Sequence, residues 1–224
     1  MKTVKHILIV GGSSGLGLEL ARKYITLGHQ VTVTGRTDPQ CEGVLYVPLD
    51  ITSDADHLQD GIEKLVEIIE PVNTLVYAAG YYQEGTLSEL SGESIVTMMN
   101  VGLLAPVMLV KVLLSHSPML LKVMLVTSSS QITPREKEPV YTAVKAGLGM
   151  FGNSLALDAK VGKVVVIAPA GMKTPFWDAA KDVSTFLDPS WVADQIIELS
   201  SGPFKYKFVK ILRDPPRVEI VESR

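Results

Sequence analysis

Short apolar runs alternate with longer segments of helical periodicity along most of the chain. The apolar runs predict strands at residues 6–10, 31–34, 44–47, 74–78, 123–127, 164–168 and 208–212. The segments between them predict helices at residues 15–27, 54–69, 94–115, 140–158 and 189–200. Runs that are apolar on both faces are typical of a parallel sheet with helices on each side. The pattern therefore predicts an α/β fold with a doubly wound parallel sheet, a three-layer sandwich.

No internal repeat, low-complexity tract or change of composition divides the 224 residues, so we expect a single domain spanning residues 1–224. Two segments lack periodicity, residues 135–139 and residues 172–188. In a doubly wound sheet, ligands bind outside the carboxyl ends of the strands, from which these segments depart. We expect residues 172–188 to form a substrate loop that closes as a lid.

A glycine-rich turn joins the first predicted strand to the first predicted helix. It reads Gly11-Gly12-Ser13-Ser14-Gly15-Leu16-Gly17. Glycine lets the backbone approach a phosphate closely, and the start of a helix supplies free N–H groups and a favourable dipole. The order strand, glycine turn, helix indicates a Rossmann-type dinucleotide site. Glycines that only permit a tight turn are the alternative interpretation.

Tyr141 and Lys145 lie four residues apart in the predicted helix 140–158, shortly after the run Ser128-Ser129-Ser130. Residues four apart share a helix face, so the ammonium group can favour the ionised form of the phenol. A serine hydroxyl from the preceding strand can hold a carbonyl or alcohol oxygen against that phenol. The pair alone also fits a tyrosine beside a solvated lysine, and it gains weight together with the glycine turn.

The composition excludes several classes of protein. Hydrophobic residues make up 46% and charged residues 20%, which is typical of a compact globular protein and not of a disordered one. A net charge of -3 gives no broad footprint for nucleic acid, so we expect no nucleic-acid partner. The first apolar run stops at Val10, too short for a signal sequence or a membrane span. We therefore expect a cytoplasmic protein without a membrane anchor.

Metal and disulfide chemistry are not expected. The single cysteine, Cys41, has no partner for an internal disulfide. The histidines lack the spacing of metal ligands or of a catalytic triad: His6, His29, His57 and His116.

With the glycine turn, the serine run and Tyr141-x-x-x-Lys145 in this order, the chain resembles the short-chain dehydrogenase/reductase family over residues 6–175. The resemblance implies an oxidoreductase that moves a hydride between a nicotinamide cofactor and a carbonyl or alcohol substrate. The family's catalytic asparagine, serine, tyrosine and lysine match Asn100, Ser129, Tyr141 and Lys145. Ser128 and Ser130 are the alternatives for the serine.

The resemblance also implies the residues that bind the cofactor. The glycine turn would cradle the pyrophosphate, Asp50 would contact the adenine, and the segment after the sixth strand would clasp the nicotinamide carboxamide. The complete set is Gly11, Ser13, Ser14, Gly15, Leu16, Gly17, Arg36, Thr37, Asp50, Ile51, Ala79, Gly80, Tyr141, Lys145, Pro169, Met172 and Thr174. Three positions depart from the family pattern and are expected to change local contacts: Tyr77, Ala78 and Ala170.

The end of the second strand, Thr34-Gly35-Arg36-Thr37, bears on the choice of cofactor. An acidic residue there would bind the ribose hydroxyls and repel a 2′-phosphate, whereas a guanidinium binds that phosphate. Arg36 therefore favours NADP(H), with NAD(H) possible if Arg36 is only a solvated turn residue.

The substrate is expected to be a small carbonyl or alcohol compound that contacts Tyr82, Gln131, Phe176 and Trp177. The predicted helices 94–115 and 140–158 resemble the pair through which family members associate, so we expect a homodimer or homotetramer. A non-catalytic protein that senses a nucleotide or binds a partner on the same fold is the alternative function.

Overall fold

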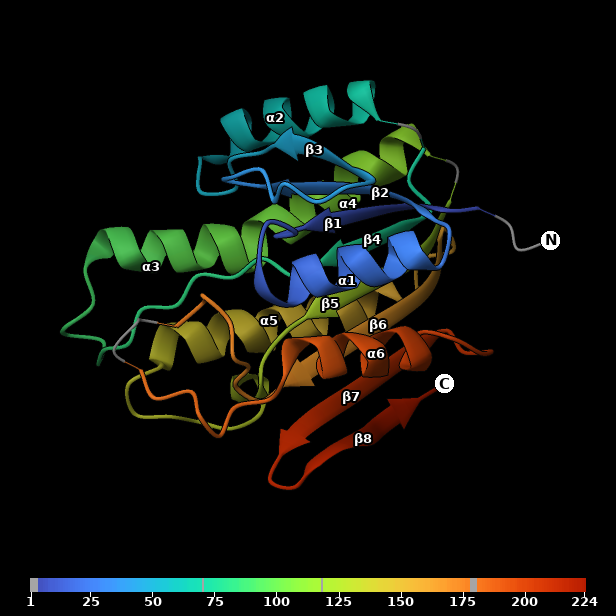
Figure 1. Ribbon diagram of the computed structural model, residues 1–224. Helices are drawn as coiled ribbons and strands as arrows, with labels where there is room; N and C mark the ends of the chain where they lie inside the picture. Colours follow the sequence, from blue (N-terminus) through green and yellow to red (C-terminus); the bar gives the residue numbers. More distant parts are fainter. Residues whose placement is uncertain (1–3, 70, 118, 178–180) are drawn as a thin grey trace.

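An eight-stranded sheet runs through the computed structural model, which describes residues 4–69, 71–117, 119–177 and 181–224 (Figure 1). The strand order is β3-β2-β1-β4-β5-β6-β7-β8. All neighbouring strands are parallel except β7 and β8. The strands are β1 His6–Val10, β2 Gln30–Gly35, β3 Val44–Pro48, β4 Thr74–Tyr77, β5 Leu120–Val126, β6 Val161–Pro169, β7 Tyr206–Arg213 and β8 Pro216–Ser223.

Helices cover both faces of this sheet and make it the middle of three layers (Figure 1). α1 (Gly15–Thr26) and α6 (Pro189–Leu199) pack together on one face. α2 (Ala55–Ile68), α4 (Ala105–His116) and α5 (Pro139–Leu155) pack on the other. The central strands β1 and β4 are buried along their whole length, as expected for strands apolar on both sides. The predicted doubly wound α/β sandwich is confirmed.

The predicted helix 94–115 is longer and less regular than its periodicity indicated. It consists of α3 (Gly92–Met99), a π-helical turn η1 (Asn100–Leu104) and α4. This continuous segment, Gly92–His116, is apolar and long enough to cross a membrane, but 44% of its most apolar window is buried inside the protein. Its residues Leu109 and Leu113 belong to the core beside the sheet, which accounts for the hydropathy of α4.

Strand β8 is absent from the sequence prediction. It forms an antiparallel hairpin with β7 and lies at the edge of the sheet. Its residues are mostly exposed, with Ile220 at 54% and Val221 at 45% of their full accessible surface. β8 pairs with a neighbouring strand along one edge only, and charged residues stand between its apolar ones. It therefore lacks the continuous apolar run that predicts the buried strands.

The chain reverses its direction of winding between β1 and β4, which lie side by side although β2 and β3 separate them in sequence. The glycine turn follows β1, and Ala78, Ala79 and Gly80 follow β4. Both segments therefore leave from the carboxyl edge of the sheet at its switch point, where doubly wound proteins bind their ligands.

Candidate active site

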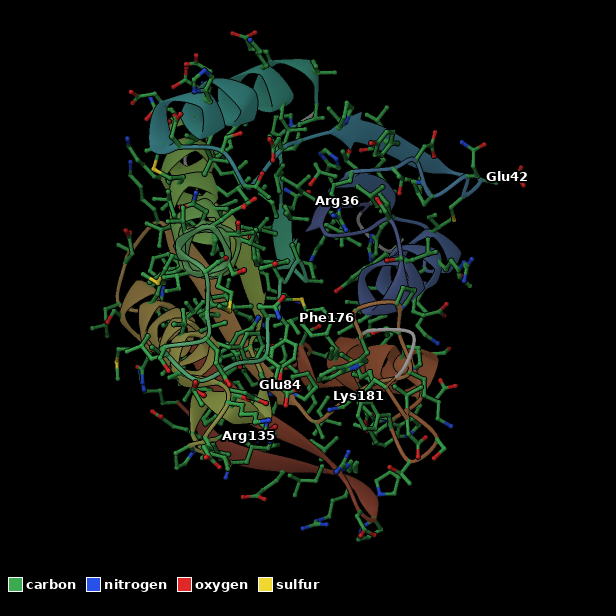
Figure 2. The ribbon with its side chains drawn as sticks, turned by 90° about the vertical axis from the view of Figure 1, so that its left-hand side faces the viewer. Arg36, Glu42, Glu84, Arg135, Phe176 and Lys181 are labelled. Atoms are coloured by element: carbon green, nitrogen blue, oxygen red, sulfur yellow. The ribbon has the colours of Figure 1, made fainter. Side chains whose placement is uncertain are left out.

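A cavity of about 710 Å³ lies at the carboxyl edge of the sheet. All the residues named above as cofactor ligands line it. Arg36 lies toward one side and Arg135 toward the other, with Phe176 between them (Figure 2). Residues from the glycine turn, from the segment after β4, from β5 and α5, and from the segment after β6 therefore share one space.

Two glycines of the turn are required by close backbone approach. Gly11 has a φ of +82°, and a Cβ there would lie 2.6 Å from the Ala79 Cα. A Cβ on Gly17 would collide with the Gly11 carbonyl oxygen. The turn is thus folded tightly against the segment after β4, and only glycine fits at these two positions.

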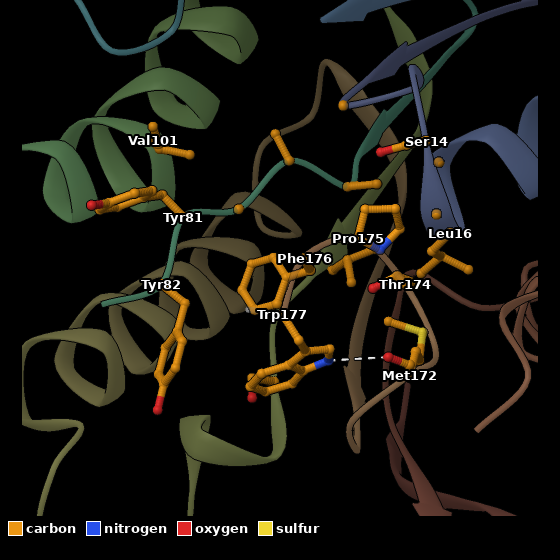
Figure 3. A pocket seen from close by; sticks show the side chains of 18 of the residues that line it. Ser14, Leu16, Tyr81, Tyr82, Val101, Met172, Thr174, Pro175, Phe176 and Trp177 are labelled. Atoms are coloured by element: carbon orange, nitrogen blue, oxygen red, sulfur yellow. Dashed lines mark hydrogen bonds between the residues drawn. The ribbon is translucent and has the colours of Figure 1, made fainter. Parts of the chain in front are cut away.

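The first turn of α1 differs from the starts of α2, α3 and α6. Asp54, Ser91 and Asp188 each cap α2, α3 or α6 through the side chain. Ser14 at the start of α1 makes no side-chain cap, and it faces the cavity (Figure 3). The first N–H groups of a helix need an acceptor, so this start is suited to a phosphate of a bound dinucleotide.

Tyr141 and Lys145 lie on the cavity side of α5, as the four-residue spacing predicts. Tyr141 is 8% and Lys145 3% exposed. The Lys145 Nζ donates to the Val126 carbonyl oxygen at 3.2 Å and lies 5.6 Å from the centroid of the Tyr141 ring. Burial lowers the pKa of Lys145 to about 8.

The pKa of the Tyr141 phenol is raised by burial. A hydrogen bond with the Ser128 side chain and the charge of Arg135 act in the opposite direction, whereas the charge of Glu138 raises this pKa further. Burial is the largest of these effects, and it keeps the phenol in its neutral form. A neutral phenol of this kind carries a proton that it can donate.

The three adjacent serines point to different partners. The Ser128 hydroxyl donates to Ser130 Oγ at 3.3 Å and lowers the pKa of Tyr141, whereas the Ser129 hydroxyl accepts from Arg135 Nη2 at 2.9 Å. Ser130 is completely buried and donates to Glu138 Oε2 at 2.6 Å. Of the three serines, Ser128 is thus the one that acts on the phenol, and which of them serves catalysis stays a prediction.

Asn100 does not line the cavity. Its side-chain amide donates to the carbonyl oxygens of Thr52 at 2.9 Å and Ser53 at 3.1 Å. Asn100 also opens the π-helical turn η1, a type of distortion that is frequent at functional sites. Tyr77, which replaces a family asparagine, donates its phenol proton to the Val101 carbonyl in that same turn. Both side chains fix the π-helical turn relative to the sheet.

Gln131 is also placed away from the cavity. Its side chain lies against Gly149 of α5, where a Cβ would collide with the amide, and its Oε1 is buried. The 3₁₀ turn η2 (Ser129–Gln131) ends at this residue, and the contact of Gln131 with substrate stays a prediction that its position against α5 does not favour.

Arg36 lines the cavity and is exposed. Within the described part of the chain, no hydrogen bond or ion pair engages its guanidinium. Next to it, Ser13 Oγ donates to the Thr37 carbonyl oxygen at 2.5 Å and occupies the space that a side chain at Gly35 would need. Asp50 lines the same region, and hydrogen bonds from Thr52 and Ser53 lower its pKa.

Aromatic side chains line the opposite part of the cavity, as Figure 3 shows for Tyr81, Tyr82, Phe176 and Trp177. The two ends of the loop that carries Phe176 and Trp177 are joined, because Lys173 N donates to the Leu187 carbonyl oxygen at 2.9 Å. Positions 178–180 of this loop lie outside the described residues. Its closure as a lid stays a prediction.

Comparison with known proteins agrees with this geometry. A family model described as short chain dehydrogenase matches residues 5–184. The chain belongs to the short-chain dehydrogenase family. The protein is therefore an oxidoreductase with a nicotinamide cofactor.

Individual relatives are distant. The chain is 26% identical to an L-fucose dehydrogenase of Mus musculus over 188 residues, which cover 78% of this chain and 67% of that one. It is 30% identical over 99 residues to the 3-oxoacyl-[acyl-carrier-protein] reductase MabA of Mycobacterium tuberculosis, which cover 44% and 40% of the two chains. These relatives are named as enzymes, which favours an oxidoreductase over a non-catalytic sensor.

Solved structures show the same fold. A short-chain dehydrogenase/reductase from Vibrio parahaemolyticus matches with a TM-score of 0.77 and 26% identity, over 91% of this chain and 98% of the other. A short chain dehydrogenase from Burkholderia cenocepacia J2315, solved in complex with NADP, matches with a TM-score of 0.75 and 19% identity over 88% and 91%.

Several lining residues are missing from the sequence-based set: Arg135, Glu138, Phe186 and Arg213. Arg135 and Glu138 lie in the non-periodic segment 135–139 before α5, where no motif distinguishes one side chain from another. Arg213 ends β7, so its position at the carboxyl edge could have been found from the strand prediction.

Proposed function

We propose that the protein is an NADP(H)-dependent reductase or dehydrogenase of a carbonyl/alcohol pair, with Tyr141 as the acid/base. The observation that carries this proposal is that Ser128, Tyr141 and Lys145 line one cavity, with the Lys145 Nζ 5.6 Å from the Tyr141 ring centroid and Ser128 lowering the pKa of the phenol. A phenol that is neutral, buried and near a serine hydroxyl can give a proton to a substrate oxygen at the same place.

The chain's own groups divide the work as follows. Ser128 holds the substrate oxygen and Tyr141 transfers a proton to it during reduction, or removes the proton during oxidation. Lys145 lies close enough to stabilise the phenolate that remains and to bind ribose hydroxyls. A reduced nicotinamide held in this cavity would supply the hydride for the carbonyl carbon.

The residues of the cavity fit such a cofactor. The tight glycine turn and the uncapped start of α1 accept the pyrophosphate, and Arg36 binds a ribose 2′-phosphate. Thr174 lies against Gly15, where a Cβ would be 3.1 Å from the threonine Cβ. The proposed carboxamide clasp is therefore next to the phosphate cradle, although Thr174 and Gly15 lie far apart in the sequence.

The test is a screen of purified protein for oxidation of NADPH, followed at 340 nm, with aldehydes, ketones and quinones. We expect turnover of at least one class with NADPH preferred over NADH. Tight NADPH binding without turnover of any compound would contradict the proposed reaction and favour the sensor.

We also propose that the protein forms a homodimer or homotetramer through the predicted helices 94–115, which corresponds to α3, η1 and α4, and 140–158, which corresponds to α5. Met99, Met150 and Leu157 are exposed by 42%, 64% and 78% around these helices. Exposed apolar side chains that gather on helices of a buried core commonly mark an interface. Light scattering after gel filtration gives the oligomeric state, and a monomer would contradict this proposal.

A further inference from the structure

A row of aromatic side chains leads away from Tyr141 along one wall of the cavity. The Tyr82 ring centroid lies 5.0 Å from that of Tyr141 and 5.5 Å from that of Trp177. The Trp177 centroid lies 5.3 Å from that of Phe186. We call Tyr141, Tyr82, Trp177 and Phe186 the aromatic row. All four line the same cavity, so a molecule held at Tyr141 can extend along it.

The polar atoms in the middle of the aromatic row are bonded to the protein. The Trp177 indole N–H donates to the Met172 carbonyl oxygen at 3.0 Å (Figure 3), and the Tyr82 phenol donates to Glu138 Oε1 at 3.3 Å. The rings therefore offer mainly their carbon surface to a ligand. A wall of this kind binds the apolar, preferably ring-bearing part of a small molecule.

Arg213 stands at the far end of the row. Its guanidinium carbon lies 5.1 Å from the Phe186 ring centroid, and it lines the cavity as the last residue of β7. Phe186 is fixed in turn, because its ring fills the space above Gly171, where a Cβ would lie 2.7 Å from it. The position of the guanidinium is therefore defined relative to the wall.

The other cations on this side of the cavity are balanced by acids. Arg135 Nη1 lies 3.3 Å from Glu138 Oε2, and Lys181 Nζ lies 3.9 Å from Glu84 Oε2. Over the ranges that the structure describes, no carboxylate forms an ion pair with Arg213. Its charge is thus available to a ligand.

We infer that the substrate is an apolar, ring-bearing carbonyl or alcohol compound with an anionic group at the end remote from the reacting carbon, and that Arg213 binds this group. The inference rests on the proposed function, because Tyr141 defines the end at which the reacting oxygen is held. A guanidinium binds a carboxylate or a phosphate through two parallel hydrogen bonds. Arg213 is then a residue that determines specificity and takes no part in the chemistry.

The experiment compares three matched series of aryl ketones in which an alkyl linker of varied length carries a carboxylate, a phosphate ester or a neutral methyl amide. With wild-type protein and NADPH, we expect kcat/KM for one anionic series to exceed that for the amides by about tenfold or more at the best linker length. The carboxylate and phosphate series distinguish the two sources of negative charge.

Variants then locate the effect. Arg213→Gln should remove the preference for the anion mainly through KM and leave the amides within about threefold, and Arg213→Lys should restore part of it. Arg217→Gln is the matched control, because Arg217 is exposed in the neighbouring hairpin and donates to the Asp214 and Pro215 carbonyl oxygens. The same ligands are titrated by Trp177 fluorescence in a Trp191→Phe background, which measures binding without turnover.

The outcomes separate the two claims. Equal turnover of anions and amides by wild type, or an equal loss for both in Arg213→Gln, overturns the inference and leaves the reductase in place. Turnover of no series, although NADPH binds, contradicts the proposed function and this inference with it.

Discussion

Ser128 lies close enough to Tyr141 to lower the pKa of its phenol, whereas the neighbouring Ser129 is bound by the Arg135 guanidinium. We therefore propose that the serine that holds a substrate oxygen against the phenol is the first of the run. Ser129 and Ser130 belong to a polar network with Arg135 and Glu138 at the side of the cavity. This division of roles leads to a direct test by mutation.

Ser128→Ala is expected to lower kcat on the order of 100-fold, because it removes a donor to the reacting oxygen. Ser129→Ala is the matched control and should stay within about threefold of wild type. Steady-state kinetics with the best substrate of the screen gives both values. A larger loss in Ser129→Ala than in Ser128→Ala would return the catalytic role to Ser129.

Tyr141→Phe is expected to lower kcat by about 100-fold or more and to leave the dissociation constant of NADPH nearly unchanged, since only the acid/base hydroxyl is lost. Tyr206→Phe serves as the control, because Tyr206 is a buried tyrosine of β7 outside the cavity lining. Kinetics and a fluorescence titration with NADPH separate the two effects. Turnover near the wild-type value would rule out Tyr141 as the acid/base.

The sequence predicts the fold well where burial on both faces leaves an uninterrupted apolar run. This rule holds for β1, β4 and the core of β6, whose predicted bounds agree with the observed ones to within a few residues. β8 could not be found in this way, because only its pairing with β7 explains a strand that is mostly exposed. The π-helical turn at Asn100 is similarly invisible to periodicity, since it changes the helix by a local register shift.

The sequence likewise predicts the positions of only some of the site residues. A four-residue spacing on a helix was enough to bring Tyr141 and Lys145 to one face. The directions of Ser128, Ser129 and Gln131 depend on the 3₁₀ turn η2, whose start and hydrogen bonds are set by the buried contacts of Ser130. No rule of spacing predicts that geometry, so the sequence alone supports Ser129 only through its motif position.

Arg36→Ala is expected to narrow the preference for NADPH over NADH by about 1.5–3 kcal/mol, because a charged hydrogen bond to the 2′-phosphate is lost. Titration of both reduced cofactors checks this. Arg22→Ala is a suitable control, since Arg22 is exposed on α1 and pairs with Glu19 outside the cavity. Equal affinities for the two cofactors in wild type would contradict the role of Arg36.

Gly35→Asp should not by itself create a preference for NADH. A side chain at position 35 collides with Ser13 Oγ, which is held by the Thr37 carbonyl oxygen. The double variant Gly35→Asp/Ser13→Gly frees this space and should bind NADH more tightly than Gly35→Asp does, because a carboxylate can accept from the ribose hydroxyls. Equal NADH affinities for the single and the double variant would show that Ser13 does not restrict this position.

The lowered pKa of Lys122 predicts that the protein becomes more stable as the solution becomes alkaline. Burial, together with the charges of Lys5, Lys163 and Lys207, lowers its pKa to about 8, and its Nζ donates to Ser200 Oγ at 3.0 Å. The folded pKa lies below the ordinary lysine value, so from about pH 8 upward the unfolded chain holds more protons at this site. The free energy of unfolding should therefore increase as the pH rises above 8.

Lys122→Met should remove the part of this pH dependence that comes from Lys122, which is at most about 3 kcal/mol for a shift of this size. Compared with wild type, the variant should therefore gain most in free energy of unfolding below pH 8. Urea unfolding at pH 7 and pH 9.5 measures this change in the free energy of unfolding. Both pH values lie below the range in which buried tyrosines with a raised pKa, such as Tyr24, would oppose the trend. Lys64→Met is the control, because Lys64 is exposed on α2 and should change the pH dependence little. The same slope in wild type and Lys122→Met would mean that Lys122 stays charged in the folded protein across this range, with water or Ser200 compensating for its burial.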